Sequence, residues 1–249
     1  MDLGLKDRVY IVTGGTRGLG LAAARELTAD GAKVVASGRG TASVASVEAE
    51  LGGPGTTVGV VADNADPGTP DRLVAAAHDA FGRLDGVLIS VGGPPTGTSD
   101  TVDDQQWRDT FESGFLGAVR LSRAVAAELG EGGVIGFVLS TSVYEPIPGL
   151  AVSNALRPGL AGYAKTLADE LGPRGVRVVG LLPAHIATDR ARELAALTGD
   201  AADAVADVPL RRYGAPEEFG RVAAFLLSPA ASYVTGAMVT IDGGTRAGF

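Results

Sequence analysis

Seven short apolar runs, separated by longer segments with helical periodicity, constrain the fold of this chain more than any other feature of its sequence. The runs have the length of buried parallel strands, and they read VYIVT, KVVAS, TVGVVA, GVLIS, GVIGFVLS, VRVVGLL and AMVTI. Segments with apolar residues at helical spacing lie between them, namely Ala22 to Leu27, Val44 to Leu51, Arg72 to Phe81, Trp107 to Leu129 and Leu160 to Leu171. This alternation predicts an α/β fold, in which a doubly wound, seven-stranded parallel sheet with right-handed crossovers is flanked by helices.

The domain organisation is expected to be simple, with one domain over residues 1–249. No shift in composition longer than a loop interrupts the alternation, and a hydrophobic content of 45% is ample for a buried core. The least regular stretch, residues 187–215, is rich in Ala and Asp and follows the sixth predicted strand. Because ligands of such sheets bind beyond the carboxyl ends of the strands, this stretch is a candidate substrate lid. A plain pair of surface helices is the alternative.

The charge and the composition argue against several classes of function. Acidic residues outnumber basic ones by 29 to 21, and the charge of −8 disfavours nucleic acid or an anionic membrane as a partner. Cysteine is absent and the two histidines, His78 and His185, lie far apart in the sequence, so no metal site is expected. The sequence contains neither a recognisable signal peptide nor an apolar run long enough to span a membrane. We therefore expect a soluble protein of the reducing cytoplasm that acts on a small molecule.

The segment TGGTRGLG, Thr13 to Gly20, follows the first predicted strand and opens the first predicted helix. Three glycines at this spacing allow a sharp turn, a close approach of the backbone to a pyrophosphate, and a helix N-terminus whose free N–H groups face that anion. The chain contains 37 glycines, so the strand-turn-helix context, more than the pattern itself, indicates a dinucleotide site. A merely structural turn is the alternative.

The sequence resembles the short-chain dehydrogenase/reductase family from end to end. Thr13, Gly14, Gly18 and Gly20 match the glycine pattern of that family, and the stretch from PLRRYGAPEEFG to VTIDGG is similar to its closing segment almost position by position. The resemblance implies a single Rossmann-type domain, a dinucleotide cofactor and a small-molecule substrate. It also implies a homodimer or homotetramer built on the fourth and fifth helices and the last strand.

The same resemblance indicates which residues contact the cofactor. They are Gly14, Thr16, Arg17, Gly18, Leu19, Gly20, Arg39, Asp63, Asn64, Ser90, Gly92, Arg157, Pro183, Ile186 and Thr188. Where relatives that select NAD carry a carboxylate for the ribose hydroxyls, this chain has Gly38 followed by Arg39. Arg17 and Arg39 are therefore expected to converge on a 2′-phosphate, which a guanidinium binds well. We expect NADP to be preferred over NAD; the alternative is that both arginines are solvated surface charges.

The active site of the family contains Asn, Ser, Tyr and Lys side chains, and the resemblance implies that only the serine is retained here. Ser140 stands at the serine position, where it would hydrogen-bond the substrate oxygen, and Gly114 stands at the asparagine position. Ser153 stands at the tyrosine position and Arg157 at the lysine position. An aliphatic hydroxyl is a poor acid, and a guanidinium does not release its proton in a useful pH range. The source of the proton is therefore open.

Pro158, which follows Arg157, bears on the geometry of this segment. Proline disfavours helical geometry in the residue before it and suits the first position of a helix, so we expect a helix to begin at Pro158. Ser153 and Arg157 would then lie in a loop. A kinked helix that runs through both positions is the alternative.

Two interpretations of the function remain. The first is an NADP-dependent oxidoreductase that acts on a carbonyl or an alcohol, with Ser140 orienting the oxygen, Arg157 holding the cofactor, and Tyr144, Ser153 or water supplying the proton. Tyr144 is the first candidate because it follows Ser140 by only four positions, although it would also serve as an apolar wall of the pocket. The second is a protein without redox activity, either a dinucleotide-binding pseudoenzyme or an enzyme of another reaction class. We favour the first, because a chain selected only for binding has less reason to keep Ser140 and an irregular lid.

Overall fold

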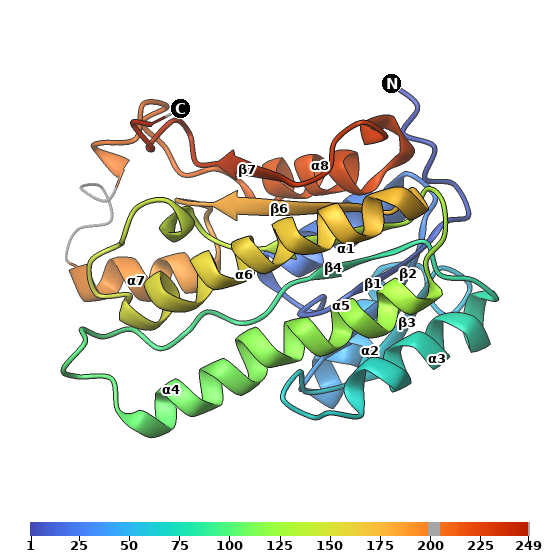
Figure 1. Cartoon of the computed structure of the whole chain (residues 1–249), viewed down its shortest axis with the longest axis horizontal. Helices are drawn as coiled ribbons and strands as arrows, with labels where there is room; N and C mark the ends of the chain where they lie inside the picture. Colours follow the sequence, from blue (N-terminus) through green and yellow to red (C-terminus); the bar gives the residue numbers. More distant parts are fainter. Residues whose placement is uncertain (199–204, 249) are drawn as a thin grey trace.

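Seven parallel strands form one sheet in the order β3-β2-β1-β4-β5-β6-β7 in the computed structural model, which describes residues 1–198 and 205–248 (Figure 1). The strands are β1 (Val9–Val12), β2 (Lys33–Gly38), β3 (Thr57–Val61), β4 (Gly86–Ile89), β5 (Val134–Val138), β6 (Arg177–Pro183) and β7 (Ala237–Ile241). Each strand overlaps one of the seven apolar runs, so the predicted fold class is confirmed. The strand order reverses between β1 and β4, and such sheets bind their ligands at that point.

Burial explains why the central strands are continuous apolar runs. All residues of β1, β4 and β5 are buried. Side chains alternate between the two faces, so Val9 and Ile11 pack into one core while Tyr10 and Val12 pack into the other. β3 and β7 form the edges of the sheet, and most of their residues are only partly buried.

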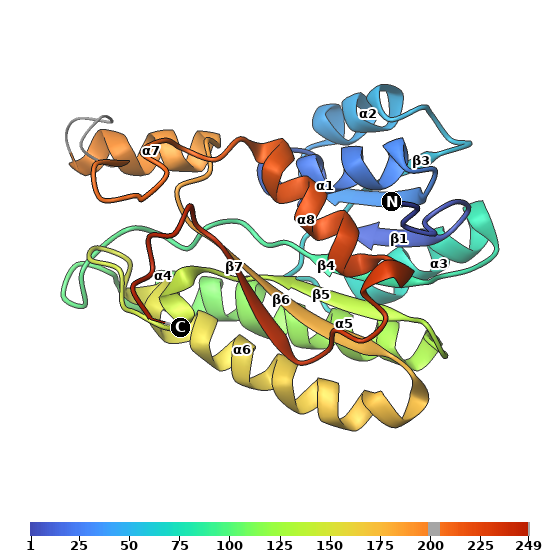
Figure 2. The ribbon, with the colours of Figure 1, turned by 90° about the horizontal axis from the view of Figure 1, so that it is seen from above.

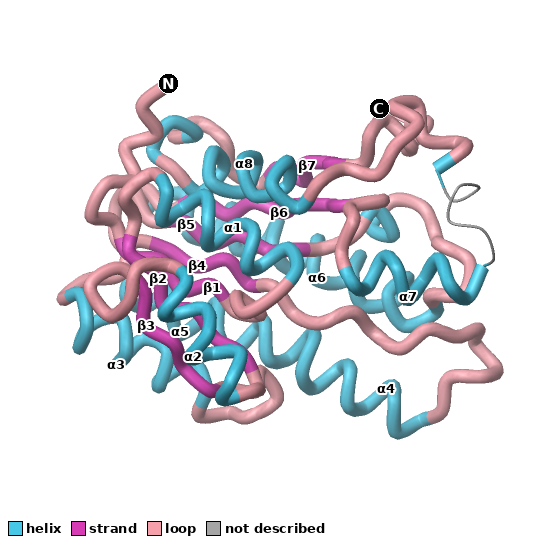
Figure 3. Tube along the Cα trace, turned by 180° about the vertical axis from the view of Figure 1, so that it is seen from behind, coloured by secondary structure: helices cyan, strands magenta, loops and turns pink. Residues whose placement is uncertain are grey.

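Helices cover both faces of the sheet. They are α1 (Gly18–Ala29), α2 (Thr41–Glu50), α3 (Thr69–Phe81), α4 (Asp104–Thr110), α5 (Gly117–Glu128), α6 (Ala151–Leu171), α7 (Asp189–Thr198) and α8 (Pro216–Leu227). α1, α2 and α8 pack on one face, and α3, α5 and α6 pack on the other (Figure 2). Figure 3 shows the strands, in magenta, enclosed between the two layers. In the part of the chain that the structure describes, no helix has both the length and the apolar character needed to cross a bilayer.

α4 and α5 are joined by a π-helical turn, Phe111–Leu116, and together they form one long helix (Figure 1). This helix corresponds to the one predicted for Trp107 to Leu129. Gly114, the residue expected at the asparagine position, lies inside the π-helical turn. Such turns are rare and occur frequently at functional sites, so the helix is distorted at a position that the sequence associates with the active site.

The prediction that a helix begins at Pro158 is wrong. α6 begins at Ala151, and Pro158 lies inside it. Asn154 anchors the first turn: its Oδ1 accepts a hydrogen bond from the N–H of Ile147 at 2.9 Å, and its Nδ2 donates to the carbonyl of Ile147 at 2.9 Å. The sequence motif around Pro158 did not reveal this anchor.

Packing explains why α6 tolerates its internal proline. Proline removes one helical hydrogen bond and costs about 3 kcal/mol inside a helix. Four large apolar residues of α6 are buried, namely Val152, Leu160, Leu167 and Leu171, and full burial of each such side chain contributes roughly 1.5–3 kcal/mol. Burial therefore outweighs the local preference. As a result, Ser153 and Arg157 are four positions apart on one continuous helix, and both are buried.

The segment predicted as a substrate lid, residues 187–215, begins with α7. Figure 1 shows α7 beyond the arrowhead of β6, at the edge where the parallel strands end. We call this edge the carboxyl edge. Residues 199–204, the middle of the predicted lid, lie outside the described residues.

Candidate functional site

The predicted site residues gather at the carboxyl edge. All of these residues except two lie on segments that follow a strand at this edge. The two exceptions, Ser153 and Arg157, lie in the first half of α6. These segments are residues 13–20 after β1, 38–40 after β2, 62–66 after β3, 90–96 after β4, 139–146 after β5, 183–193 after β6 and 242–246 after β7. Parallel strands end at the same edge, so the topology alone brings these distant parts of the sequence together.

The turn after β1 requires glycine at three positions. Gly14 and Gly18 have φ angles of 58° and 54°, in the left-handed region that favours glycine. A Cβ on Gly20 would lie 2.3 Å from the carbonyl oxygen of Gly14, and a Cβ on Gly14 would lie 2.6 Å from the carbonyl oxygen of Ser90. These contacts pack β1, α1 and the segment after β4 tightly together. The structure thus gives a steric reason for the glycine pattern.

Thr13 joins the ends of β1 and β4. Its Oγ1 donates to the carbonyl of Ser90 at 3.0 Å and accepts from the N–H of Ser90 at 2.9 Å. Both residues are buried. This double hydrogen bond fixes the position of the segment after β4 relative to the glycine turn, at the point where the strand order reverses.

The N-terminus of α1 is available to an anion. Arg17 occupies the position before the helix with an extended backbone, and no side chain among the described residues caps the helix. Thr188, which follows β6, reaches the same place: its methyl carbon lies 4.0 Å from the position that a Cβ on Gly18 would take. A helix N-terminus with free N–H groups favours a phosphate, so the residues present fit a pyrophosphate between α1 and Thr188.

Arg190 of α7 contacts the segment that follows β4. Its Nη2 donates to the carbonyl of Pro94 at 2.6 Å, and its side chain lies against Gly93. α7 therefore contacts the segment after β4. The sequence analysis did not single out Arg190, because Arg190 and Pro94 are 96 positions apart in the sequence.

Gly38 at the end of β2 cannot be replaced without rearrangement. A Cβ at this position would lie 2.7 Å from both Cγ2 and Oγ1 of Thr16. Arg17 and Arg39 are exposed beside this contact, and neither makes an ion pair or a side-chain hydrogen bond with any residue that the structure describes. A side chain at position 38 would therefore require Thr16 to move, and two guanidinium groups are available nearby.

Asp63 and Asn64 belong to the segment that follows β3 at the carboxyl edge. The Oδ1 of Asp63 accepts a hydrogen bond from the N–H of Ala65 at 2.9 Å, and the backbone carbonyl of Asp63 accepts one from Thr69 Oγ1 at 2.6 Å. The backbone of Asn64 lies against α5, since a Cβ on Gly117 would lie 2.3 Å from the Asn64 carbonyl oxygen. Both residues are thus held at the carboxyl edge by their neighbours.

Three serines form a hydrogen-bonded chain between the segment after β5 and α6. Ser140 Oγ accepts from the N–H of Ser142 at 3.1 Å, and Ser142 Oγ lies 3.1 Å from Ser153 Oγ. Ser142 and Ser153 are 2% and 4% exposed. Ser142, which the sequence analysis missed, is therefore the direct partner of Ser153. The sequence STS at positions 140–142 is the signal that could have identified it.

Arg157 carries a buried positive charge. Its Nη1 donates to the backbone carbonyl of Val138 at 2.7 Å, and burial lowers the pKa of its guanidinium to about 10. No carboxylate in residues 1–198 or 205–248 lies within ion-pair distance of it. A buried charge without a counter-ion is costly, which indicates that this site favours an electron-rich ligand.

Tyr144 lies farther out on the segment after β5. Its hydroxyl donates to the carbonyl of Met238 at 3.5 Å, and the guanidinium of Arg246 lies 3.8 Å from the centre of its ring. The side chain is largely exposed. The structure does not bring the Tyr144 hydroxyl into hydrogen-bond contact with Ser140 or Ser153.

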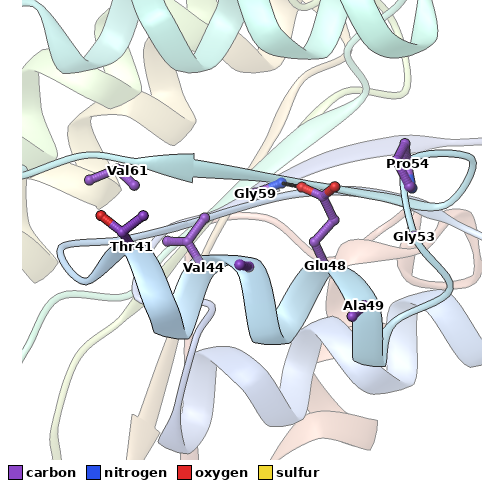
Figure 4. Close-up of a pocket in the computed structure, with 9 residues that line it drawn as sticks. Thr41, Val44, Glu48, Ala49, Gly53, Pro54, Gly59 and Val61 are labelled. Carbon is purple, nitrogen blue, oxygen red and sulfur yellow. Dashed lines mark hydrogen bonds between the residues drawn. The ribbon is translucent and has the colours of Figure 1, made fainter.

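A surface hollow of about 450 Å³ lies between α2 and β3, apart from the predicted site residues (Figure 4). Glu48 crosses it, and its Oε2 accepts the N–H of Gly59 at 2.8 Å. The hollow contains none of the predicted site residues; it is lined by Thr41, Val44, Ala45, Glu48, Ala49, Gly53, Pro54, Gly59 and Val61. Glu48 satisfies an outward N–H of an edge strand, which protects that edge from pairing with another chain.

Comparisons with known proteins agree with this geometry. The sequence profile of the family described as "Enoyl-(Acyl carrier protein) reductase" matches residues 14–246. The curated Dehydrogenase/reductase SDR family member 4 of Homo sapiens is 35% identical over 246 residues, which are 97% of this chain and 88% of that protein.

Two solved structures are similar over the whole chain. A short-chain dehydrogenase/reductase, glucose/ribitol dehydrogenase, from Brucella melitensis has a TM-score of 0.94 at 28% identity and full coverage of both chains. L-sorbose reductase from Gluconobacter frateurii, complexed with NADPH and L-sorbose, has a TM-score of 0.88 at 28% identity, also with full coverage of both chains.

Proposed function

Because this chain belongs to the short-chain dehydrogenase/reductase family and has the scaffold of its oxidoreductases, we propose that it is an NADP-dependent enzyme that interconverts a carbonyl group and an alcohol. One observation carries the proposal. The glycine turn, the serine chain and the buried charge of Arg157 all lie at the same carboxyl edge. This is the arrangement that a dinucleotide and a polar substrate require if they are to meet.

The preference for NADP rests on the end of β2. Position 38 is a glycine whose Cβ position is crowded by the Thr16 side chain, so no carboxylate at this position would repel a 2′-phosphate. Arg17 and Arg39 would bind that phosphate, while the N-terminus of α1 and Thr188 would hold the pyrophosphate. Ser90, Gly92, Pro183 and Ile186 would line the nicotinamide end. When bound, the reduced cofactor supplies a hydride to the carbonyl carbon of the substrate.

The serine chain and Arg157 would act on the substrate oxygen and the cofactor ribose. Ser140 and Ser153 would hydrogen-bond the oxygen, and Ser142 would hold Ser153 in position. Arg157 would bind the ribose hydroxyls and stabilise negative charge that develops on the oxygen. It cannot relay a proton, because its guanidinium stays protonated near neutral pH even with its lowered pKa of about 10.

The proton donor in this proposal differs from the family's tyrosine. Ser153 and Arg157 occupy the positions of the family's tyrosine and lysine, and Ser153 is too weak an acid to replace a phenol. Tyr144 is one candidate, but its hydroxyl donates to the Met238 carbonyl and its ring lies under Arg246. It would have to leave both partners to reach a substrate oxygen.

We further propose a homodimer or homotetramer in the cytoplasm. Phe111 is 45% exposed and stacks on Phe115 at 5.2 Å between ring centres, on the long α4–α5 helix. β7 is a half-exposed edge strand. Both features suit surfaces that another copy of the chain covers. Residues 187–215 would act as the substrate lid, with Arg190 joining α7 to the segment after β4.

A direct assay tests the proposed activity. Purified protein is incubated with NADPH and L-sorbose, and with a panel of aldehydes and ketones, while the absorbance of NADPH is followed and the alcohol product is quantified. We expect carbonyl-dependent oxidation of NADPH with one alcohol formed per cofactor, and loss of this activity in Arg157→Met. Tight binding of NADPH without turnover of any carbonyl or alcohol would contradict the proposal and point to a protein without redox activity.

A further inference from the structure

His185 lies within the segment after β6 on which Pro183, Ile186 and Thr188 are expected to contact the cofactor. β6 runs between β5 and β7: Leu139 donates its N–H to the carbonyl of Leu181, and Pro183 is paired with Ile241. His185 follows two residues beyond Pro183. It is therefore placed at the carboxyl edge beside the segments that follow both neighbouring strands.

The backbone of His185 is held in an unusual conformation. Its φ angle is 50°, in the left-handed region that residues with a side chain rarely adopt. The N–H of Gly214 donates to the His185 carbonyl at 2.9 Å, and Ile186 forms a bridge with Gly214. Residues forced into this region by surrounding contacts are concentrated at functional sites.

The imidazole of His185 lies near the ring of Tyr213 and within electrostatic range of Asp242. Its ring centre is 6.2 Å from that of Tyr213, at a tilt of 60°. Asp242, which follows β7, is the carboxylate that acts on it electrostatically. The Asp242 side chain is itself fixed, since Oδ1 accepts from the N–H of Gly244 at 2.9 Å and Oδ2 accepts from the N–H of Arg246 at 3.0 Å.

For proton exchange near neutral pH, we compare His185 with three other ionisable groups of the described carboxyl edge, namely Arg157, Tyr144 and Asp242. Arg157 does not release its proton. The Tyr144 hydroxyl is directed to the Met238 carbonyl. The Asp242 carboxylate accepts two backbone hydrogen bonds. Histidine is the side chain that titrates in this range, and its two ring nitrogens let it both donate and accept.

We propose that His185 exchanges the proton with the substrate oxygen in the reaction of this enzyme. This inference rests on the proposed NADP-dependent function and names the group that replaces the family's tyrosine. In the reducing direction, the carbonyl carbon takes the hydride that the cofactor supplies, and the C–O double bond becomes single. The oxygen then takes a proton from the imidazolium of His185, whose N–H bond breaks as the O–H bond forms. The products are the alcohol, the oxidised cofactor and neutral imidazole, and in the oxidising direction neutral His185 removes the proton.

The charges around His185 determine the expected pH dependence. Burial lowers the pKa of His185 below its ordinary value of 6.5, and Asp242 opposes this shift. On the segment that carries Tyr213, Arg212 is paired with Glu218 at 2.7 Å. Neutral imidazole therefore predominates at neutral pH, so alcohol oxidation rises to a plateau as the pH increases through this pKa, while carbonyl reduction decreases.

The two histidines of the chain make this proposal testable without turnover. The C–H resonances of His185 and His78 are assigned with the variants His185→Asn and His78→Gln, since asparagine tolerates the left-handed backbone. Each resonance is then followed during titration with NADP⁺ and, separately, with adenosine 2′,5′-bisphosphate, which lacks the nicotinamide. His78 is the control, because it lies on α3 and pairs with Glu128 at 3.1 Å.

We expect NADP⁺ to shift the His185 resonance and its titration midpoint, whereas adenosine 2′,5′-bisphosphate shifts neither and His78 responds to neither ligand. In kinetics with NADPH and a carbonyl that the wild type reduces, His185→Asn should lower kcat/KM by about 10²–10⁴-fold and remove the pH dependence assigned to His185. His78→Gln should retain both. Binding of NADP⁺ that leaves the His185 resonance unchanged, or an unaltered pH profile in His185→Asn, would overturn the inference while the proposed function stands. Failure of NADP⁺ to bind would instead overturn the proposed function, and this inference with it.

Discussion

The hydroxyl oxygens of Ser142 and Ser153 lie 3.1 Å apart, and both side chains are almost completely buried. One residue follows β5 and the other belongs to the first turn of α6. Neither hydroxyl is thus oriented by solvent, and each depends on the other for its direction. The pair places a directed hydroxyl one helical turn before the buried charge of Arg157.

This relationship predicts strong coupling in a double-mutant cycle. Ser142→Ala and Ser153→Ala should each lower kcat/KM by about 10-fold to 100-fold, because a hydrogen bond to a developing charge contributes roughly 1.5–3 kcal/mol. The double variant should lose little more than the worse single variant, since each serine acts through the other. The exposed Ser232→Ala is the control and should behave as the wild type. Steady-state kinetics that show independent, additive losses would contradict the paired role.

Arg157→Met should separate function from stability. The variant removes a buried charge that has no counter-ion among the described residues, so its free energy of unfolding should stay within about 1 kcal/mol of the wild type or increase. At the same time, kcat/KM should decrease by about 100-fold or more because the positive charge is lost. Urea unfolding and kinetics on the same preparations check both expectations. Destabilisation of more than about 3 kcal/mol with normal activity would mean that Arg157 is structural.

Gly20→Ala should damage both the fold and the cofactor site, because the new Cβ would lie 2.3 Å from the carbonyl oxygen of Gly14. We expect a loss of about 2 kcal/mol or more in unfolding free energy, as for other overpacked sites, together with weaker cofactor binding. Gly162→Ala on α6 is a matched control, because nothing lies within 4 Å of its Cβ position. That change should stabilise the protein by about 0.5–1 kcal/mol. Equal effects of the two substitutions on thermal unfolding would contradict the steric account of the turn.

His185 should also make stability depend on pH. Its pKa in the folded protein is lowered from 6.5 by burial, with Asp242 opposing the shift. Between the folded pKa and 6.5 the unfolded chain binds more protons, so the free energy of unfolding rises with pH there and falls as the pH decreases. His185→Asn removes this contribution, so the stability of the variant relative to the wild type should improve on going from about pH 7.5 to about pH 5. Urea unfolding at both pH values, with His78→Gln alongside, checks this; a pH-independent difference between variant and wild type would contradict it.

The sheet was predictable because central strands such as β4 are buried on both faces and are therefore continuous apolar runs. The glycine turn was predictable because its backbone excludes side chains at Gly14 and Gly20. The start of α6 was not, since the local preference of Pro158 is outweighed by burial against a sheet built from distant segments. The wrong prediction for the start of α6 also meant that Ser142 was missed, because its hydrogen bond with Ser153 is apparent only when Ser153 is placed on the helix. The contact between Arg190 and Pro94 likewise depends on tertiary packing that no local pattern records.

The preference for NADP is tested most directly by calorimetric titration of the wild type with NADPH and with NADH. Arg17 and Arg39 make no ion pair or side-chain hydrogen bond within the described chain, and position 38 is a glycine that carries no carboxylate. Charge-assisted contacts to a 2′-phosphate should therefore make the Kd for NADPH lower by about 10-fold to 100-fold, which corresponds to roughly 1.4–2.8 kcal/mol. The variant Arg17→Ala with Arg39→Ala should bind both cofactors equally, and Arg108→Ala should bind them as the wild type does. Equal affinities in the wild type, or tighter binding of NADH, would contradict the account.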